Sequence, residues 1–333
     1  MVGVEETSNR SKGAGQLMIA AMAIALAAGL ASALMFASIT SGAAISLLLI
    51  ILAPLPLMVV GLGWGAATAA IGGGAATVLI AALFGLPYSI AFVLVNVLPA
   101  WWLAHLILLA RPHQNAAGDP DDALEWYPVG RILIWIVIFA TIVTAATLLT
   151  MGSDAATIQK TLRTGWVELV EATGLALNDS TLDALVLIAP IGAEITAVAM
   201  LTINLWLAAK IAATSGRLHR PWPDLKSTTL PMTAIAVLFA AIVCSFAGGL
   251  PAIMAQVLTS GLSMAYAMTG FAVLHTLTLA MKSRALWLGC VYAVVAGFAW
   301  ALLAIALLGL ADAVFGFRER YLRSRSPPPL PKS

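Results

Sequence analysis

Charged side chains are confined to a few short stretches of the chain, and long apolar stretches separate them. Residues 13–110 form a run of 98 positions without Asp, Glu, Lys or Arg, and residues 227–281 form another of 55. A helix needs about 20 mostly apolar residues to cross the hydrocarbon core of a bilayer. These runs predict transmembrane helices, because unpaired backbone groups cannot face lipid and no alternation typical of a barrel strand is present.

The pattern predicts nine spans, with eight as the alternative. They cover 16–37, 43–60, 64–84, 88–110, 129–151, 184–210, 230–249, 257–281 and 285–311. A polar N-terminal segment over 1–15 and a basic, Pro-rich tail over 316–333 flank this membrane domain, 16–315. Nine crossings place the basic tail and a cytoplasmic N-terminus on opposite sides, against the positive-inside tendency, whereas eight place them on the same side.

Proline and glycine mark breaks inside two of these regions. Pro54 and Pro56 remove two backbone donors, which predicts a kink or a break in the second span. Gly248 and Gly249, followed by Pro251, predict the end of one helix and the start of the next in the run 227–281.

The amino-acid composition excludes whole classes of protein. Hydrophobic residues make up 61% of the 333 positions and charged residues only 10%, where a soluble domain has about 25% charged. A water-soluble enzyme or a nucleic-acid-binding protein is therefore excluded. The net charge of +2 gives no indication of an acidic partner.

One segment between the fifth and sixth spans has a different period. Apolar residues recur there at steps of three and four, while charged residues occupy the other positions, which predicts an amphipathic helix over about 156–175. The apolar stripe consists of Ile158, Leu162, Trp166, Leu169, Val170 and Thr173. Two interpretations remain open: a helix lying on the membrane surface, or a lid over a binding cavity.

Several motifs of enzymes and metalloproteins are absent. No G-x-x-x-x-G-K-[ST] phosphate loop is present, the four histidines show no metal-ligand spacing, and the spans hold too few charged groups for a catalytic triad. The acidic turn with Asp119, Asp121 and Asp122 lacks the spacing of a calcium loop. We therefore expect no enzymatic activity, no metal and no cofactor.

Polar residues inside the spans are the remaining candidates for function. Glu194 is the single carboxylate within a predicted span, and an intramembrane acid is costly enough to suggest a functional role. Asn96, Ser263 and Tyr266 lie at similar depth in other even-numbered spans, so the four residues predict a small-solute site. The alternative for Glu194 is a protonated side chain bonded across helices, and Asn204 is expected to link helices in that way.

Three stretches resemble a known family: NLWLAAKI from Asn204, RPWPDL from Arg220, and GLADAVFGFRER from Gly309. They are similar to domain-of-unknown-function family 2232, bacterial polytopic membrane proteins related to the substrate-binding S components of energy-coupling-factor transporters. This resemblance implies an S-component-like core, a bound vitamin or similar small molecule, and partnership with a transmembrane coupling protein and ATPases. It also implies a small-residue docking face on the first span, formed by Ala20, Ala23, Ala27 and Ala31. The chain has two or three spans more than the usual six.

The sequence thus predicts an all-α, multi-pass protein of the bacterial inner membrane. The expected function is binding or transport of a small solute, with energy supplied by a partner. The alternative is a non-transporting scaffold or assembly factor that binds other membrane proteins through Glu194 and the loops.

Overall fold

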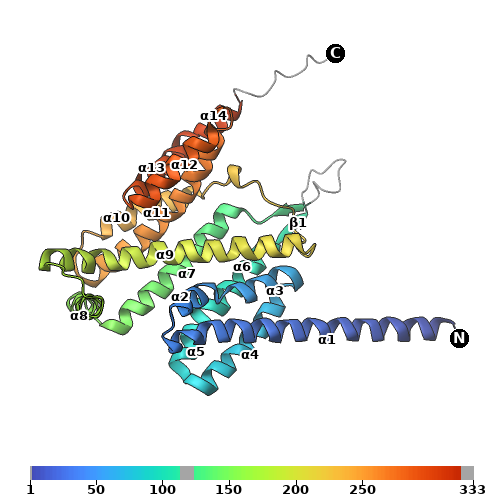
Figure 1. The fold of residues 1–333 in the computed structure, drawn as a ribbon. Helices are drawn as coiled ribbons and strands as arrows, with labels where there is room; N and C mark the ends of the chain where they lie inside the picture. The colour runs from blue at the N-terminus through green and yellow to red at the C-terminus, as the bar shows by residue number, and fades with distance from the viewer. Residues whose placement is uncertain (1, 113–123, 324–333) are drawn as a thin grey trace, which may run out of the picture. The chain divides into compact units, whose positions relative to one another are not determined.

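The computed structural model describes residues 2–112 and 124–323, with side chains from residue 15 onward except that of residue 17. The chain, whose helices and strands are drawn in Figure 1, divides into two compact units. One comprises residues 1–127 and 200–222, and the other residues 128–199 and 223–333. Each unit is described by itself. The acidic turn with Asp119, Asp121 and Asp122 and the end of the Pro-rich tail lie outside the described residues.

The first unit is helical apart from one short hairpin. Its elements are α1 (Val2–Ala37), a 3-10 turn (Ser38–Ser41), α2 (Ala44–Leu52), α3 (Leu55–Trp64), α4 (Ala66–Phe84), α5 (Leu86–Phe92), a π-helical turn (Val93–Val97), α6 (Leu98–Leu108), β1 (Ala110–Pro112) and β2 (Leu124–Trp126). The two strands pair antiparallel, with Arg111 opposite Glu125. The segment 1–15 is not a separate element, because the backbone of α1 is helical from Val2 onward.

The second unit contains the remaining helices and shares one with the first. Its elements are α7 (Val129–Met151), α8 (Ala155–Thr173), α9 (Asp179–Thr214), a 3-10 turn (Leu225–Ser227), α10 (Met232–Cys244), α11 (Gly249–Leu277), α12 (Arg284–Gly297), α13 (Ala301–Phe315) and α14 (Phe317–Arg323). The division between the units falls within α9, after Ala199.

The protein is an all-α, multi-pass membrane protein. Seven helical segments of the described chain are long and apolar enough to cross a membrane, and an eighth is obtained if α13 and α14, which meet at a 63° bend, form one broken span. The seven are Met18–Ser41, Ala44–Trp64, Ala66–Phe84, Leu86–Leu108, Val129–Met151, Asp179–Thr214 and Gly249–Leu277. With the broken span the count is eight, the lower of the two numbers that the sequence predicts; the preferred number of nine spans is not reached.

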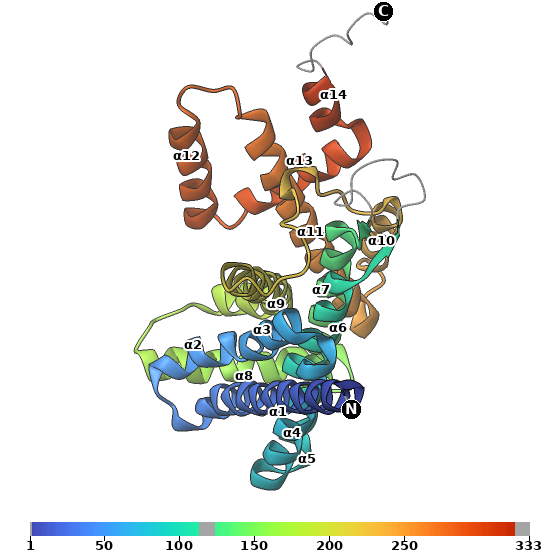
Figure 2. The same ribbon diagram turned by 90° about the vertical axis from the view of Figure 1, so that its right-hand side faces the viewer.

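Two expected spans are shorter in the structure than in the sequence pattern. The region 230–249 contains only the 13 residues of α10, about 20 Å of helix, where a bilayer core is about 30 Å thick. The region 285–311 is divided into α12 and α13, because the chain becomes extended at Phe298. Figure 2 shows α12 and α13 as separate helices joined by a turn. No proline or charge marks that division, so the apolar pattern could not reveal it.

The two breaks predicted from proline and glycine are present. α2 ends at Leu52 and α3 begins at Leu55 with Pro54 as its N-cap. Gly248 and Gly249 have φ values of 78° and 64°, which glycine adopts without strain, and α11 begins there.

Small residues allow close helix contacts within each unit. In the first, α1 packs on α4 where a Cβ at Gly29 would overlap the carbonyl oxygen of Gly72. In the second, α11 packs on α13 where a Cβ at Gly309 would overlap the carbonyl oxygen of Tyr266. Such contacts are typical of helices in lipid, where the hydrophobic effect does not drive helices together.

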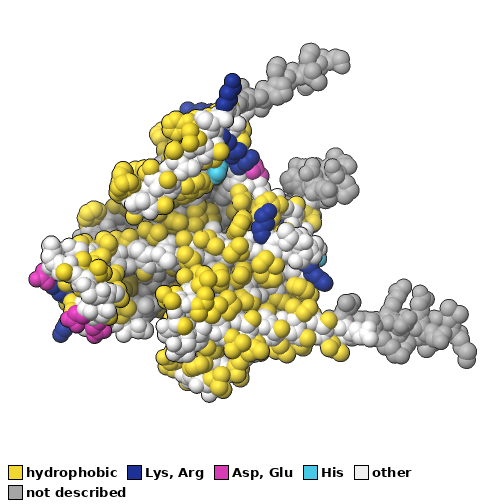
Figure 3. Space-filling model, viewed as in Figure 1, with side chains coloured by type: hydrophobic (Ala, Val, Ile, Leu, Met, Phe, Trp, Pro, Cys, Tyr) yellow, Lys and Arg dark blue, Asp and Glu magenta, His cyan; other side chains and the backbone are white. Residues whose placement is uncertain are grey.

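The face of the molecule shown in Figure 3 is mainly hydrophobic, with few charged side chains. Large apolar residues are exposed on membrane-length helices of both units, among them Leu83 at 66% and Leu187 at 57%. A surface of this kind is unfavourable in water and favourable against lipid tails.

Candidate functional site

Glu194 lies where three helices of the second unit meet. Its side chain is 0% exposed. Thr141 of α7 donates a hydrogen bond from Oγ1 to Oε1 of Glu194 at 2.9 Å. A Cβ added at Gly261 of α11 would lie 2.5 Å from that oxygen. The carboxyl group is therefore enclosed by α7, α9 and α11, and the glycine provides the space for it.

Pro190 and Gly192, which precede Glu194 on α9, do not make this space. α9 continues as one helix through Pro190, and nothing lies within 4 Å of a Cβ placed at Gly192. The close approach occurs instead at Gly261, which is 67 positions away in the sequence. Sequence patterns on α9 alone could not identify this partner.

The second carboxyl oxygen of Glu194, Oε2, is buried and makes no hydrogen bond with the described residues. An ionised carboxylate in hydrocarbon needs a cation or several donors, and a protonated one needs an acceptor for its hydrogen. Among the described residues only Thr141 makes a hydrogen bond to the carboxyl group, and the Thr144 hydroxyl lies nearby without one to Oε2, so neither form is fully satisfied. The Glu194 carboxyl group therefore lacks one hydrogen-bond partner among the described residues.

A groove between α7, α8 and α9 lies directly beside this group. Its volume is about 620 Å³, and its lining is mainly apolar, with Trp166 and Leu169 of α8 and Pro190 and Ala193 of α9 among its residues. Thr144, Thr147 and Thr161 contribute hydroxyl groups. Thr144 also lies close to the Glu194 carboxyl group. Ligand sites are typically of this size and combine apolar walls with a few polar groups.

A second, smaller pocket lies on another side of the same stretch of α9. It has a volume of about 260 Å³ between α9, α11 and α13, with Ile195 and Ala306 in its lining. The polar lining comes mostly from one face of α11, namely Gln256, Thr259, Ser260 and Ser263. Ser263 is thus part of a cavity, but this cavity is separate from the groove beside α8.

Tyr266 and Glu194 are both buried in the second unit, but no hydrogen bond joins them. The Tyr266 side chain is 1% exposed, and its hydroxyl group has no partner among the described residues. Successive residues of a helix are 100° apart, so Ser263 and Tyr266 are on different faces of α11 from Gly261, which contacts Glu194. The structure does not gather the expected residues of α9 and α11 around one point.

Asn96 belongs to the first unit, where it lies in the π-helical turn. It is 0% exposed, and neither its amide nitrogen nor its amide oxygen has a hydrogen-bond partner in that unit's described part. The turn arises because Pro99 cannot donate a backbone bond, and Leu98 donates instead to Val93, five residues back. Asn204 behaves as expected: its Nδ2 donates to the carbonyl of Ile51, which links α9 to α2.

The amphipathic helix α8 forms one wall of the groove. Ile158 is 0% exposed and packs in a cluster with Leu148 of α7 and Ile253 and Val257 of α11. Asp154 caps the helix by accepting from the backbone N–H of Thr157 at 3.0 Å. The stripe that the sequence predicted is therefore only partly used for packing, because Leu169 is 51% exposed.

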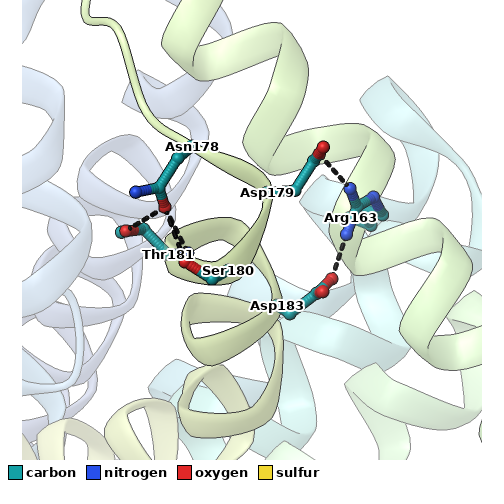
Figure 4. A network of polar contacts seen from close by, with 6 residues as sticks. All are labelled: Arg163, Asn178, Asp179, Ser180, Thr181 and Asp183. Atoms are coloured by element: carbon teal, nitrogen blue, oxygen red, sulfur yellow. Dashed lines mark hydrogen bonds and ion pairs between the residues drawn. The ribbon is translucent and has the colours of Figure 1, made fainter.

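A polar network holds the other half of α8 to the start of α9 (Figure 4). Arg163 makes ion pairs with Asp183 and, at 2.7 Å, with Asp179. Asn178 begins α9 by accepting from the backbone N–H of Thr181 at 2.8 Å. The pairs are exposed, so they hold α8 weakly compared with buried contacts.

Sequence reasoning missed a buried ion pair at the start of the tail. Arg318 donates from Nε to Oδ2 of Asp312 at 2.7 Å, and both are buried. Its other nitrogens donate to the carbonyls of Lys226 and Thr228. Both residues of the pair lie in the GLADAVFGFRER stretch. The sequence feature that could have revealed it is Asp312 at the end of an apolar run, with Gly316 four residues later as a helix-ending glycine.

Basic and aromatic side chains also pair in the first unit. Lys210 lies 4.6 Å from the centre of the Trp222 ring, and Arg217 lies 4.5 Å from that of Trp64. Arg220 is buried and donates to the carbonyl of Ile107 at the end of α6. Burial lowers the pKa of the Arg220 guanidinium. These contacts resemble the interfacial belts of membrane proteins.

His275 hydrogen-bonds Tyr292 of α12, with 2.8 Å between its Nε2 and the hydroxyl oxygen. The sequence pattern gave no indication of this pair. Among the described residues, no group of three or more His, Cys, Asp or Glu side chains is placed to hold a metal ion.

No family model, curated protein or solved structure gives a significant match to this chain. The interpretation of the site therefore depends on its own geometry.

Proposed function

We propose that this protein binds a small solute within the membrane and acts as a binding or transport component. The observation that carries the proposal is the Glu194 carboxyl group, fully buried with one oxygen unpartnered, beside a groove of about 620 Å³. A buried polar group that lacks a partner is costly, and a ligand that supplies the partner would bind strongly.

The groove favours a largely apolar solute with one or two hydrogen-bonding groups. Its walls are mostly aliphatic, with Trp166 as an aromatic surface and three threonine hydroxyls spaced along it. Thr144 lines the groove and lies close to Glu194, so a solute that binds in the groove can interact with the carboxyl group through the Thr144 hydroxyl. Ser263 in the smaller pocket, together with Tyr266, belongs to the same unit and forms a second group of candidate contacts. Asn96 is a separate candidate in the first unit.

In this proposal α8 is a lid for the groove. It contributes Leu162, Trp166 and Leu169 to the lining. It is anchored at its start by Ile158 and held further along by the exposed ion pairs of Arg163. A helix with one firm end and one weak end can open at the weak end, which would admit a solute.

Energy coupling and location complete the proposal. The resemblance to S components supports a transmembrane coupling protein and ATPases as partners, and the bacterial inner membrane as the location. On α1, Ala20, Ala23 and Ala27 are exposed and Ala31 is half-buried, and the helix packs on α4 through a different face that includes Ala25 and Gly29. This exposed face leaves α1 available for a partner, as docking requires.

Native mass spectrometry of the full-length protein, released from mild detergent, tests the proposal. We expect a retained small molecule in the wild type, and its loss in Ala193→Phe, which fills the groove. Thr196→Phe, on an exposed position of α9 outside the lining, is the matched control and should retain it.

The rival function predicts a different outcome. If no small molecule is found under a range of growth and purification conditions, and Glu194→Ala changes only a co-purifying membrane protein, the solute proposal fails. The scaffold or assembly function would then be favoured.

A further inference from the structure

Glu194 lies beside two of the cavities of the second unit, although its own side chain lines neither. Its neighbour Ala193 lines the groove between α7, α8 and α9, and its other neighbour, Ile195, lines the pocket between α9, α11 and α13. On the groove side, the Thr144 hydroxyl lies close to the carboxyl group. On the pocket side, Ser260 precedes Gly261, the residue whose Cα faces Oε1.

Both cavities can hold water at their polar positions. The groove has the hydroxyls of Thr144, Thr147 and Thr161. The pocket has those of Thr259, Ser260 and Ser263, and the amide of Gln256. A water molecule needs two to four polar partners to be stable in an otherwise apolar space. Thr147, Thr161 and Ser260 donate to backbone carbonyls and can still accept from water. Thr144 both lines the groove and lies close to the Glu194 carboxyl group, so its hydroxyl offers a route between water in the groove and that group.

The ligand that best fits the unpartnered Oε2 is a proton. No Lys, Arg or His lies on α11 between residues 249 and 274 or on α7 between residues 132 and 151, so neither helix supplies a cation to an ionised Glu194. The titratable group on those stretches is Tyr266, which is on a different face of α11. A metal ion would need more oxygen ligands than the carboxyl group and two hydroxyls provide.

We propose that Glu194 is a proton-exchange site that takes up and releases a proton through the Thr144 hydroxyl and water in the groove between α7, α8 and α9. Uptake forms an O–H bond at Oε2 and changes the charge of the group from −1 to zero. Release returns the proton to water and breaks that bond, so no other reactant is needed. Oε1 remains the hydrogen-bond acceptor of Thr141 in both states. This inference goes beyond solute binding and does not depend on it.

Infrared difference spectroscopy of the full-length protein in lipid vesicles, titrated from mildly acid to mildly alkaline pH, provides the test. We expect a carbonyl stretching band of a protonated carboxylic acid that decreases as the pH rises and is missing in Glu194→Gln. The frequency of this band should be higher in Thr141→Val, because the hydrogen bond to the carbonyl oxygen is lost. Glu168→Gln, at an exposed position on α8, should leave the band unchanged.

If Glu194→Gln does not fold, the wild-type protein can be tested alone, by recording the same band after transfer to heavy water. In the wild type the band should shift when the proton is replaced by deuterium, because the site exchanges with water. A protonated band that neither titrates nor shifts, or the absence of any such band at acid pH, would overturn the proposal. Either result would leave the mass-spectrometric test of solute binding unaffected.

Discussion

Arg318 and Asp312 form a buried ion pair across the bend between α13 and α14. The Nε–Oδ2 distance is 2.7 Å, and the exposed fractions of the two side chains are 8% and 4%. Gly316, with a φ of 65°, makes the bend between them. Arg318 also binds two carbonyl groups of the chain segment that leads into α10. One guanidinium thus ties together parts of the chain about 90 residues apart.

Replacement of Arg318 by Ala should strongly destabilise the second unit. The Asp312 carboxylate would be left buried without its cation, which costs about 3–5 kcal/mol of unfolding free energy. Thermal unfolding in detergent is the measurement. The control is Arg323→Ala, which breaks an exposed pair with Glu319 and should change the unfolding free energy by no more than about 1 kcal/mol. Equal effects of the two substitutions would contradict this role for Arg318.

Two glycines of α4 offer a matched pair for helix packing. A Cβ at Gly72 would overlap the carbonyl oxygen of Ala25, whereas nothing lies within 4 Å of one at Gly74. Gly72→Ala should therefore separate α1 from α4 and cost about 1–3 kcal/mol. Gly74→Ala should be neutral or stabilise by up to about 1 kcal/mol, because alanine favours the helix. The unfolding midpoints of the two variants, compared in one detergent, would distinguish these outcomes.

The start of α8 should depend on pH through Asp154. Hydrogen bonds from the backbone N–H and the side chain of Thr157 lower the pKa of Asp154 below its ordinary value of 3.8. The stabilisation is therefore present above pH 3.8 and is lost as the pH falls through the lowered value. Protection of the amides of Thr157 and Ile158 from hydrogen exchange, measured relative to the intrinsic rate at each pH, should decrease in acid.

Asp154→Asn is the control for this effect. Asparagine accepts the same cap hydrogen bond but does not titrate in this range. Exchange at the same amides should then be independent of pH after correction for the intrinsic rate. Acid sensitivity that persists in this variant would assign the effect to another group.

Arg163→Gln should release the weakly held half of α8. The ion pairs with Asp179 and Asp183 would be lost, and exposed pairs contribute at most about 1 kcal/mol each. A spin label at Leu169→Cys, in a chain with Cys244 and Cys290 replaced by Ser, should become more mobile. High salt should reproduce this in the wild type and add little in the variant. Unchanged mobility would identify α8 as a fixed interfacial helix.

The membrane class and most helices could be predicted from the sequence because they depend on local properties. An apolar run of membrane length, the missing N–H of Pro54 and the backbone freedom of Gly248 each act within a few residues of their own position. The amphipathic stripe from Ile158 to Thr173 likewise fixed α8 to within about two residues at each end.

The candidate site could be predicted only in part. Glu194 was identifiable because a lone carboxylate in an apolar run is conspicuous, and its burial agrees with that hypothesis. Depth along parallel helices, however, does not specify which face a side chain occupies. For that reason Ser263 and Tyr266 were expected beside Glu194 but lie on other faces of α11 than the glycine that contacts it.

Hydrophobicity and backbone restriction are properties of short segments, so the amino-acid pattern alone indicates a helical membrane protein with one intramembrane acid and one amphipathic helix. The folded structure was needed to see that Thr141 and Gly261 enclose that acid, that α12 and α13 are separate, and that Arg318 is buried against Asp312 and the loop before α10. These features depend on which distant surfaces pack together. That outcome is set by the summed contacts of whole helices, which no local pattern contains.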